Sequence, residues 1–185
     1  MNPYDQATPG NDIIDLRDVV EERDRIVTAF HDAAEERDAD AIAENEADPR
    51  GDDRCSNECV CTISEKMDAD AYEDLADLAE VIEENGDLMD AAEITPDDLD
   101  YLRAVAELVG DICDDIRSAA QNEPVMILDS YFEEYAEQLA DDIGAIDRDA
   151  GWPVCHIDWK AAAEALAQDY TEVTFGGNTY LWRAY

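Results

Sequence analysis

Apolar residues recur at two different spacings along the chain. Up to about residue 120 they fall three or four positions apart, as on one face of a helix; beyond it, short β-rich runs separate helical stretches. This pattern predicts an α+β fold that is predominantly α-helical. An acidic N-terminal helical hairpin or bundle is followed by a small α+β module with a C-terminal β-hairpin. We assign residues 1–11 to a flexible head, 12–120 to the helical region and 121–185 to the module.

Residues 12–46 are predicted to form one long helix. Its apolar positions follow the alternating steps of three and four that are typical of a coiled-coil seam: Ile13, Leu16, Val20, Val27, Phe30, Ala34 and Ala41. Arg23 and Arg37 occupy two further positions of this register, which weakens the seam. The pattern therefore favours a helix that folds back on its neighbour over one that forms a homodimer.

Two more helices are predicted in the helical region, after a loop at 48–63 that Pro49 and Gly51 introduce. The first covers about 69–84 and ends at Asn85-Gly86. The second covers about 95–119, because Thr95-Pro96 followed by two acidic residues is a strong helix start.

The module shows strand signals at both of its ends. We expect, in order, a strand at 125–128, a helix at 131–143, a short helix after Asp158, and strands at 171–175 and 179–183. Asp158 should cap the short helix, with Trp159, Ala162, Ala163 and Leu166 facing inward. Gly176-Gly177-Asn178 between the last two strands is a hairpin signal.

The charge of the chain limits its partners. Asp and Glu number 50 against 12 Lys and Arg, for a net charge of −38. Direct binding to nucleic acid needs a basic face, and attraction to an anionic membrane needs the same, so both are disfavoured. The net charge is −10 over residues 1–50, −18 over 51–121 and −10 over 122–185. The negative charge is thus spread along the whole chain. This favours adaptation to a high-salt cytoplasm as the main cause of the acidity, with DNA mimicry as the competing explanation.

Membrane insertion and secretion are not indicated. The N-terminal residues MNPYDQATPG lack the basic and apolar regions of a signal peptide, and no apolar run approaches the length of a membrane span. The five cysteines form no regular framework, so reduced thiols are expected. These features predict a cytoplasmic protein, in the host cytoplasm if a virus encodes it.

Three cysteines in seven residues form the one candidate metal site. Cys55, Cys59 and Cys61 could supply most of a tetrahedral zinc site, with the fourth ligand from Cys155, His156 or His31. The spacing matches no common zinc finger, so free thiols are the favoured interpretation and structural zinc the alternative. No other cofactor is expected.

No catalytic constellation stands out. Cys155-His156 could suggest a nucleophile and its base, but adjacent residues on an extended segment point to opposite faces. Acidic pairs have little specificity among 50 carboxylates, and the chain lacks the phosphate-binding and zinc-protease motifs. We therefore expect a protein that is not an enzyme.

The C-terminal third resembles the last domain of ArdA-type antirestriction proteins. Asp129–Gly144 is similar to the opening helix of that domain, with its Tyr-Ala pair, surrounding acids and closing glycine. Ile157–Leu166 resembles its second element, and Asp169–Val173 with Tyr180–Arg183 resembles its terminal β-ribbon. Leu75–Ile82 is a weaker match to an earlier helix. The β-containing first domain of the family has no counterpart, and the matched positions are mostly core and capping residues.

This resemblance implies a function. ArdA proteins are elongated acidic dimers that mimic bent DNA and occupy the DNA groove of type I restriction–modification enzymes. We therefore expect an antirestriction-like DNA mimic from a virus or mobile element, binding a host restriction–modification enzyme or other DNA-binding protein. Its acidic surface would include Glu133, Glu134, Glu137, Asp141 and Asp142. The alternative is a structural or adaptor protein from a halophile that binds its partner through the long N-terminal helix.

Overall fold

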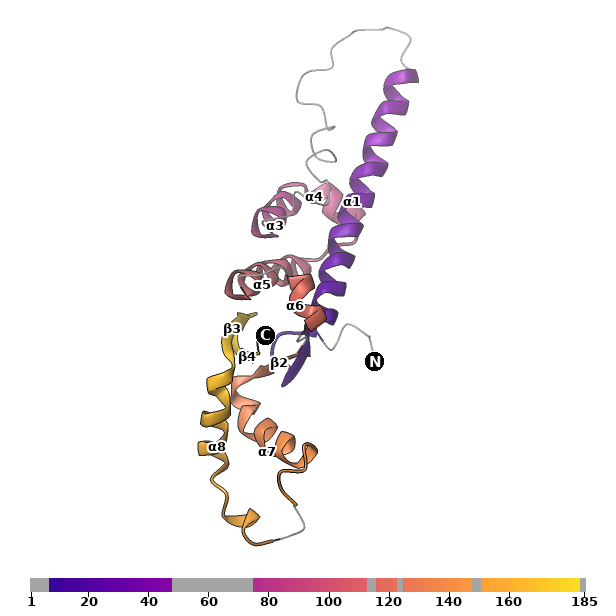
Figure 1. The fold of residues 1–185 in the computed structure, drawn as a ribbon. Coiled ribbons are helices and arrows are strands. Elements are labelled where there is room, and N and C mark those ends of the chain that lie inside the picture. Colours follow the sequence, from indigo (N-terminus) through magenta and orange to yellow (C-terminus); the bar gives the residue numbers. More distant parts are fainter. Residues whose placement is uncertain (1–6, 48–74, 113–115, 123–124, 148–150, 184–185) are drawn as a thin grey trace. The chain divides into compact units, whose positions relative to one another are not determined.

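The computed structural model describes residues 7–47, 75–112, 116–122, 125–147 and 151–183 (Figure 1). The elements in chain order are β1 (Ile13–Asp15), α1 (Leu16–Ala47), α3 (Leu75–Glu84), α4 (Gly86–Ala91), α5 (Pro96–Ile112), α6 (Ile116–Asn122), β2 (Val125–Leu128), η2 (Asp129–Tyr131), α7 (Phe132–Asp142), η4 (Val154–His156), α8 (Trp159–Leu166), η5 (Ala167–Asp169), β3 (Thr171–Phe175) and β4 (Asn178–Trp182). The fold is α+β and predominantly helical, as predicted.

The chain divides into two compact units. One consists of residues 1–22 and 107–185, and the other of residues 23–106. Helices α1 and α5 contribute residues to both. Among the described helices, none combines the length and the apolarity that crossing a bilayer requires.

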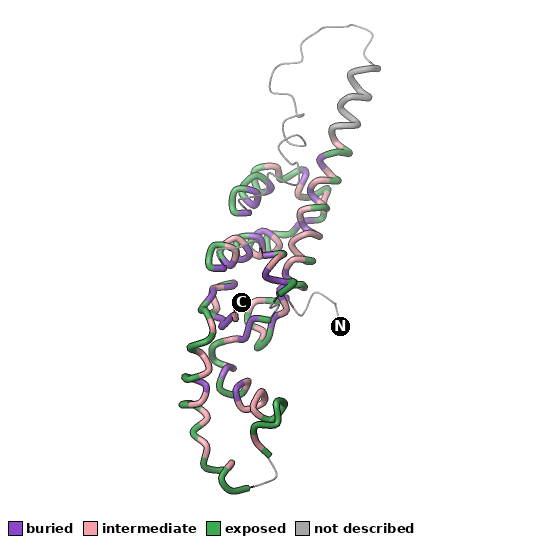
Figure 2. Tube along the Cα trace, in the orientation of Figure 1, coloured by how far each residue is buried: buried purple, intermediate pink, exposed green. Residues whose placement is uncertain are grey.

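The helical unit is built around apolar faces of α1, α3, α4 and α5. Its fully buried side chains include Ile26, Phe30, Ile82, Leu102 and Val105. Figure 2 shows buried positions alternating with exposed ones along these helices. Ion pairs also join the helices: Arg25 with Asp98, Arg37 with Asp87, and Arg103 with Glu83. Of the helix predicted at 69–84, the part from Leu75 onward is confirmed; the rest lies outside the described residues.

The buried face of α1 differs slightly from the predicted seam. Val19 and Ile26 are fully buried, whereas the predicted Val20 and Val27 are half-buried. Both pairs are apolar neighbours in sequence, so spacing alone could not choose between them. The chain itself covers this face through Ala34, as expected for a helix that folds back.

Helix α5 begins with reciprocal capping. The Asp98 amide donates to Thr95 Oγ1 at 3.3 Å, and the Asp98 carboxylate accepts from the Thr95 amide at 2.8 Å and the Thr95 hydroxyl at 2.6 Å. Burial raises the pKa of Asp98, but hydrogen bonds from Thr95 and Arg25 more than offset this, and the net pKa lies below its ordinary value. The predicted helix start at Thr95-Pro96 is confirmed, but the predicted end at about 119 is wrong, because α5 ends at Ile112 and a separate helix, α6, begins at Ile116.

Replacing Asp98 with asparagine should lower the free energy of unfolding by about 1–2 kcal/mol at neutral pH. Because the folded-state pKa is depressed, this stabilisation is present above the ordinary pKa of 3.8 and disappears as the pH falls through the folded value. Urea unfolding at a series of pH values, followed by circular dichroism, measures it. The control is Asp97→Asn, an exposed neighbour in the same turn; equal losses in both variants would contradict the prediction.

The other unit contains a four-stranded antiparallel sheet in the order β1-β2-β4-β3. Side chains alternate between its faces. Ile127 and Leu181, opposite each other on β2 and β4, pack with Phe132, Ala136 and Ala163 from helices α7 and α8. The residues on the opposite face are also buried: Ile14, Met126, Val173, Phe175, Tyr180 and Trp182.

The structure corrects the start of the long helix. Residues 13–15 form β1, with Ile14 opposite Met126, and the helix begins at Leu16 instead of residue 12. Asp15 Oδ1 accepts from the Arg17 amide at 2.9 Å, which satisfies a free donor of the first helical turn. The side-chain hydrogen bond from Arg17 also holds the pKa of Asp15 below its ordinary value. Ile13 and Leu16 fit a helical spacing, and only pairing with a distant strand decides otherwise.

The described part of the predicted head, residues 7–11, contacts the sheet unit instead of lying loose. Ala7 is buried, and the Gly10 amide donates to the Tyr180 hydroxyl at 2.7 Å. The same hydroxyl donates to the Asn11 carbonyl oxygen at 3.2 Å. Burial raises the pKa of Tyr180, so the hydroxyl stays protonated to higher pH.

The remaining elements agree closely with the sequence pattern. Strand β2 and the β3–β4 hairpin are confirmed, with Phe175 opposite Asn178. Asp158 caps α8, because its Oδ1 accepts from the Ala161 amide at 3.1 Å. Of the four α8 residues expected to face inward, Ala163 is buried, while Trp159, Ala162 and Leu166 are half-buried.

Candidate functional site

Helix α7 places a row of carboxylates on the surface of the sheet unit. Phe132 and Ala136 are buried against α8 and the sheet, which leaves the opposite face of the helix to solvent. Glu133 and Glu134 are exposed and Glu137 is half-buried. Acidic residues in the first turn also suit the positive end of the helix dipole.

Three of these carboxylates line one open hollow. Its volume is about 460 Å³, and its lining consists of Ser130, Glu133, Glu134, Glu137 and Gln138. Glu133, Glu134 and Glu137 are therefore brought together, as the sequence suggested. The walls are polar, which fits a cationic group better than an apolar ligand.

The other two predicted acids stand apart from the hollow. At 100° per residue, Asp141 lies roughly 80° around the helix from Glu133 and continues the same row. Asp142 lies roughly 180° from Glu133 but only about 80° from Glu134, at the other edge of the outer face of α7. Both are exposed. We call Glu133, Glu134, Glu137 and Asp141, which fall within about 100° of one another, the acidic row; Asp142 lies at its edge.

Ser130 and Gln138 complete the hollow, and neither is among the predicted site residues. The Gln138 amide donates to the Tyr131 hydroxyl at 2.7 Å and to Glu134 Oε1 at 3.3 Å, which ties the acidic face to the turn before α7. The spacing of four residues between Glu134 and Gln138 was a sequence signal for this contact. No comparable signal pointed to Ser130.

The row carries a dense negative charge. Helix α7 has five acidic residues and no Lys or Arg in 11 positions. Four acids from Glu133 to Asp141 span eight helical rises, or about 12 Å, which is about one charge per 4 Å. One strand of duplex DNA carries about one charge per 3.4 Å of axis. The axial intervals are uneven, at about 1.5, 4.5 and 6 Å, and it is their mean that is close to the charge spacing of a single phosphate strand.

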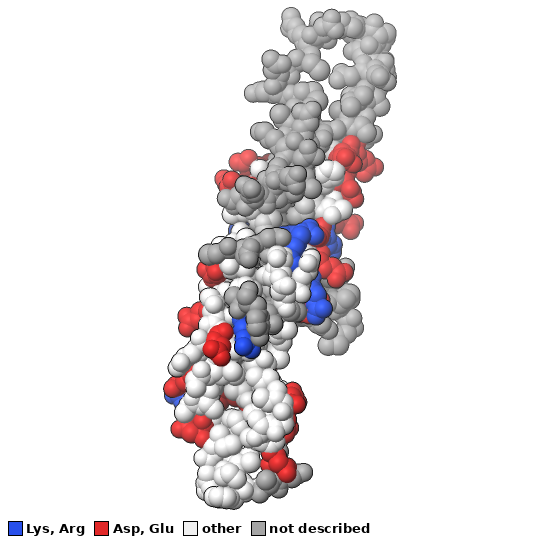
Figure 3. Space-filling model, in the orientation of Figure 1, with Lys and Arg blue, Asp and Glu red and all other residues white. Residues whose placement is uncertain are grey.

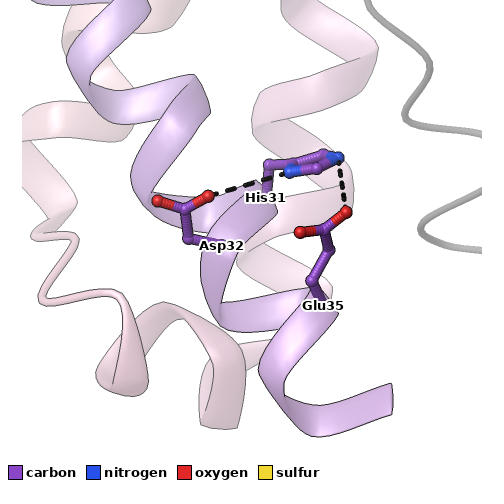
Figure 4. Close-up of side chains that lie close together, drawn as sticks. All are labelled: His31, Asp32 and Glu35. Atoms are coloured by element: carbon purple, nitrogen blue, oxygen red, sulfur yellow. Dashed lines mark ion pairs between the residues drawn. The ribbon is translucent and has the colours of Figure 1, made fainter. Parts of the chain in front are cut away.

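A histidine between two carboxylates forms a separate cluster on α1. His31 Nδ1 lies 3.9 Å from Asp32 Oδ1, and His31 Nε2 lies 3.8 Å from Glu35 Oε1 (Figure 4). Within the described part of the chain this trio is a group of potential metal ligands, with ligand atoms up to 4.8 Å apart. Around one tetrahedral zinc ion they would lie about 3.4 Å apart, and only one ring nitrogen can bind the ion. With a carboxylate at each nitrogen, the trio is not arranged around a single ion.

The structure describes Cys155 but not the three clustered cysteines. Cys55, Cys59 and Cys61 lie outside the described residues, so the zinc site stays a prediction. Cys155 is free and exposed. The segment Val154–His156 is a 3-10 turn, which corrects the extended conformation expected there. The His156 amide donates to the Pro153 carbonyl at 2.9 Å, so local hydrogen bonding shapes this segment.

Comparisons with known proteins add no relative. No protein-family model, curated protein or solved structure matches the chain.

Proposed function

We propose that the chain is a non-enzymatic DNA mimic that binds and inhibits a restriction–modification enzyme, or a similar DNA-binding enzyme, through the acidic face of α7. The observation that carries this proposal is the row formed by Glu133, Glu134, Glu137 and Asp141, with its phosphate-like spacing. A binding groove for DNA is lined with Lys and Arg, and these groups would pair with carboxylates presented at similar intervals.

The architecture of α7 supports a binding role for its outer face. Its inner face is anchored by a buried aromatic contact, Phe132 to Tyr170, with ring centroids 5.0 Å apart. The Gln138 bridge further restricts the first turns. A preordered row of charges loses less conformational entropy on binding than flexible acidic side chains on a loop.

The adaptor alternative uses the long helix α1. Its apolar face from Leu16 to Ala34 is buried within the chain, which leaves no free apolar stripe on that part of the helix. The DNA-mimic proposal is therefore the better supported of the two.

The direct test is an in vitro type I restriction assay with the protein in stoichiometric excess. We expect inhibition of DNA cleavage, and we expect the Glu133→Gln/Glu134→Gln/Glu137→Gln variant to be roughly tenfold weaker or worse at low salt. Molar salt should weaken an inhibitor that binds through charge alone steeply, unless apolar contacts support it, whereas an adaptor would keep its partner.

The matched control is Glu80→Gln/Glu84→Gln/Glu107→Gln. It removes the same three charges from exposed positions on α3 and α5. Equal weakening by both variants would show that only total charge matters and would refute the α7 site. A lack of inhibition, in salt that the enzyme tolerates, would refute the function itself.

A further inference from the structure

The connection between α7 and α8 presents two large apolar side chains to solvent. Trp152 is 76% exposed and Ile143 is 69% exposed, the two highest values among the large apolar residues described. The next, Ile13, is 44% exposed. Single exposed apolar residues are ordinary, but a tryptophan left this open forgoes the burial of a large ring.

The backbone around these two residues is ordered by local hydrogen bonds. After α7, the Gly144 amide donates to the Asp141 carbonyl and the Ala145 amide to the Ala140 carbonyl, each at 2.9 Å. Beyond Trp152, the Cys155 amide donates to the Gly151 carbonyl at 2.8 Å. Trp152 is thus held in a defined turn, and presenting it costs little conformational entropy at the moment of binding.

The surroundings of Trp152 are acidic. Residues 141–160 include five acidic and two basic residues, for a net charge of −3. Asp142, Asp147 and Asp158 are exposed in this stretch. In Figure 3, acidic side chains lie along the edges of the α7–α8 part, around an uncharged surface at its end. An apolar anchor with an acidic rim is complementary to a basic partner and repels a second copy of this chain, whose net charge is −38.

We propose that exposed Trp152 anchors a basic protein, with an arginine of the partner stacked on its indole, and that exposed Ile143 adds an apolar contact to the same partner. This inference rests on the proposed function, and it adds a second contact and the kind of group that contact recognises. Arginine is the basic residue that combines charge with stacking on aromatic faces, and tryptophan is the strongest partner for it. The chain already contains one such contact, with Arg183 Cζ 6.0 Å from the centroid of the Tyr170 ring.

The anchor would maintain affinity at high salt, where the acidic row contributes little. At molar salt the screening length falls to about 3 Å, so exposed carboxylates contribute little to affinity. Contact with an indole ring depends less on screening, because it buries apolar surface. The row would steer the encounter, and the anchor would keep the complex together in salt.

The test uses the full chain with two probes, a ten-residue arginine-rich peptide and its lysine counterpart. Indole N–H signals in NMR spectra report on Trp152, Trp159 and Trp182 separately. We expect the arginine peptide to shift the Trp152 signal most and to bind more tightly than the lysine peptide at 1 M NaCl. The Trp152→Ala variant should bind it at least about tenfold more weakly there.

Ile143→Ala should show a smaller loss in the same direction, and Ile13→Ala, an exposed apolar residue outside the connection, should show none. Equal binding of the two peptides at 1 M NaCl, or no effect of Trp152→Ala, would overturn the anchor. Self-association that Trp152→Ala abolishes would instead assign the surface to a second copy. The assay needs no restriction enzyme, so its failure is distinguishable from failure of the proposed function.

Discussion

Replacing Phe132 with alanine should lower the free energy of unfolding of the sheet unit by about 3–5 kcal/mol, as expected for a large ring removed from a core. Phe132 is 3% exposed and packs edge-on against Tyr170, at 5.0 Å and 77° between the rings. It also contacts Tyr135, with ring centroids 5.6 Å apart. The cavity would open where α7, α8 and the sheet meet, so the surrounding side chains could collapse only in part.

Urea unfolding followed by tryptophan fluorescence measures this loss, since all three tryptophans lie in the sheet unit. Phe132→Leu should lower the free energy of unfolding by less, because the leucine side chain fills part of the volume of the removed ring. Ile143→Ala, just beyond the same helix and 69% exposed, should stay within about 0.5 kcal/mol of the original. A loss below about 1 kcal/mol in Phe132→Ala would contradict the buried position of the ring.

The same variant bears on function. The acidic row is presented because the inner face of α7 is packed against α8 and the sheet, and Phe132 is the largest buried side chain of that cluster. Inhibition by Phe132→Ala should therefore fall as the unit begins to unfold, at a temperature at which the original protein still inhibits. This temperature dependence separates loss of the scaffold from loss of charge in the glutamine variants.

Replacing Gly176 with alanine should have the second-largest effect and lower the free energy of unfolding by about 2–4 kcal/mol. Gly176 and Gly177 form the two-residue turn of the β3–β4 hairpin, with φ of +55° and +74°. A Cβ added at Gly176 would lie 2.3 Å from Pro9 Cβ and 2.5 Å from Pro9 Cγ. The substitution combines backbone strain with a clash against the N-terminal segment.

Gly177→Ala is the matched control, because it has the same kind of backbone strain and nothing within 4 Å of the added atom. Gly177→Ala should lower the free energy of unfolding, measured by chemical denaturation, by about 1–2 kcal/mol. Adding Pro9→Gly to Gly176→Ala should recover the difference between the two variants. Equal losses at both glycines, or no recovery, would show that Pro9 does not lie against the turn.

Elements with strong local signals were predictable from the sequence. The Thr95 and Asp158 caps and the Gly176-Gly177 turn each involve residues a few positions apart, and the structure confirms all three. Strand β2 was readable because Val125–Leu128 is a short apolar run bounded by turn residues. Helix α4 was missed, since Asn85-Gly86 ends α3 and a six-residue helix leaves little periodicity to detect.

The candidate site was predictable only in part. The five acids of α7 could be named from sequence, but only the structure shows that Glu133, Glu134 and Glu137 line one hollow and that Asp141 and Asp142 do not. Ser130 joins the hollow from the turn before the helix. The exposure of Trp152 could not be foreseen, because tryptophan more often marks a core than an open turn.

By itself, then, the sequence determined the α+β class, the start of α5, the principal helix and strand positions after residue 124, and the strongly acidic surface, because these follow from local chemistry and composition. Only the tertiary structure decided that Ile13–Asp15 pairs with β2 and that Gly10 is bonded to Tyr180, 170 residues away. It also decided that Val19 and Ile26 of α1 face inward instead of Val20 and Val27. These features depend on contacts between distant segments, whose free energy no local spacing encodes.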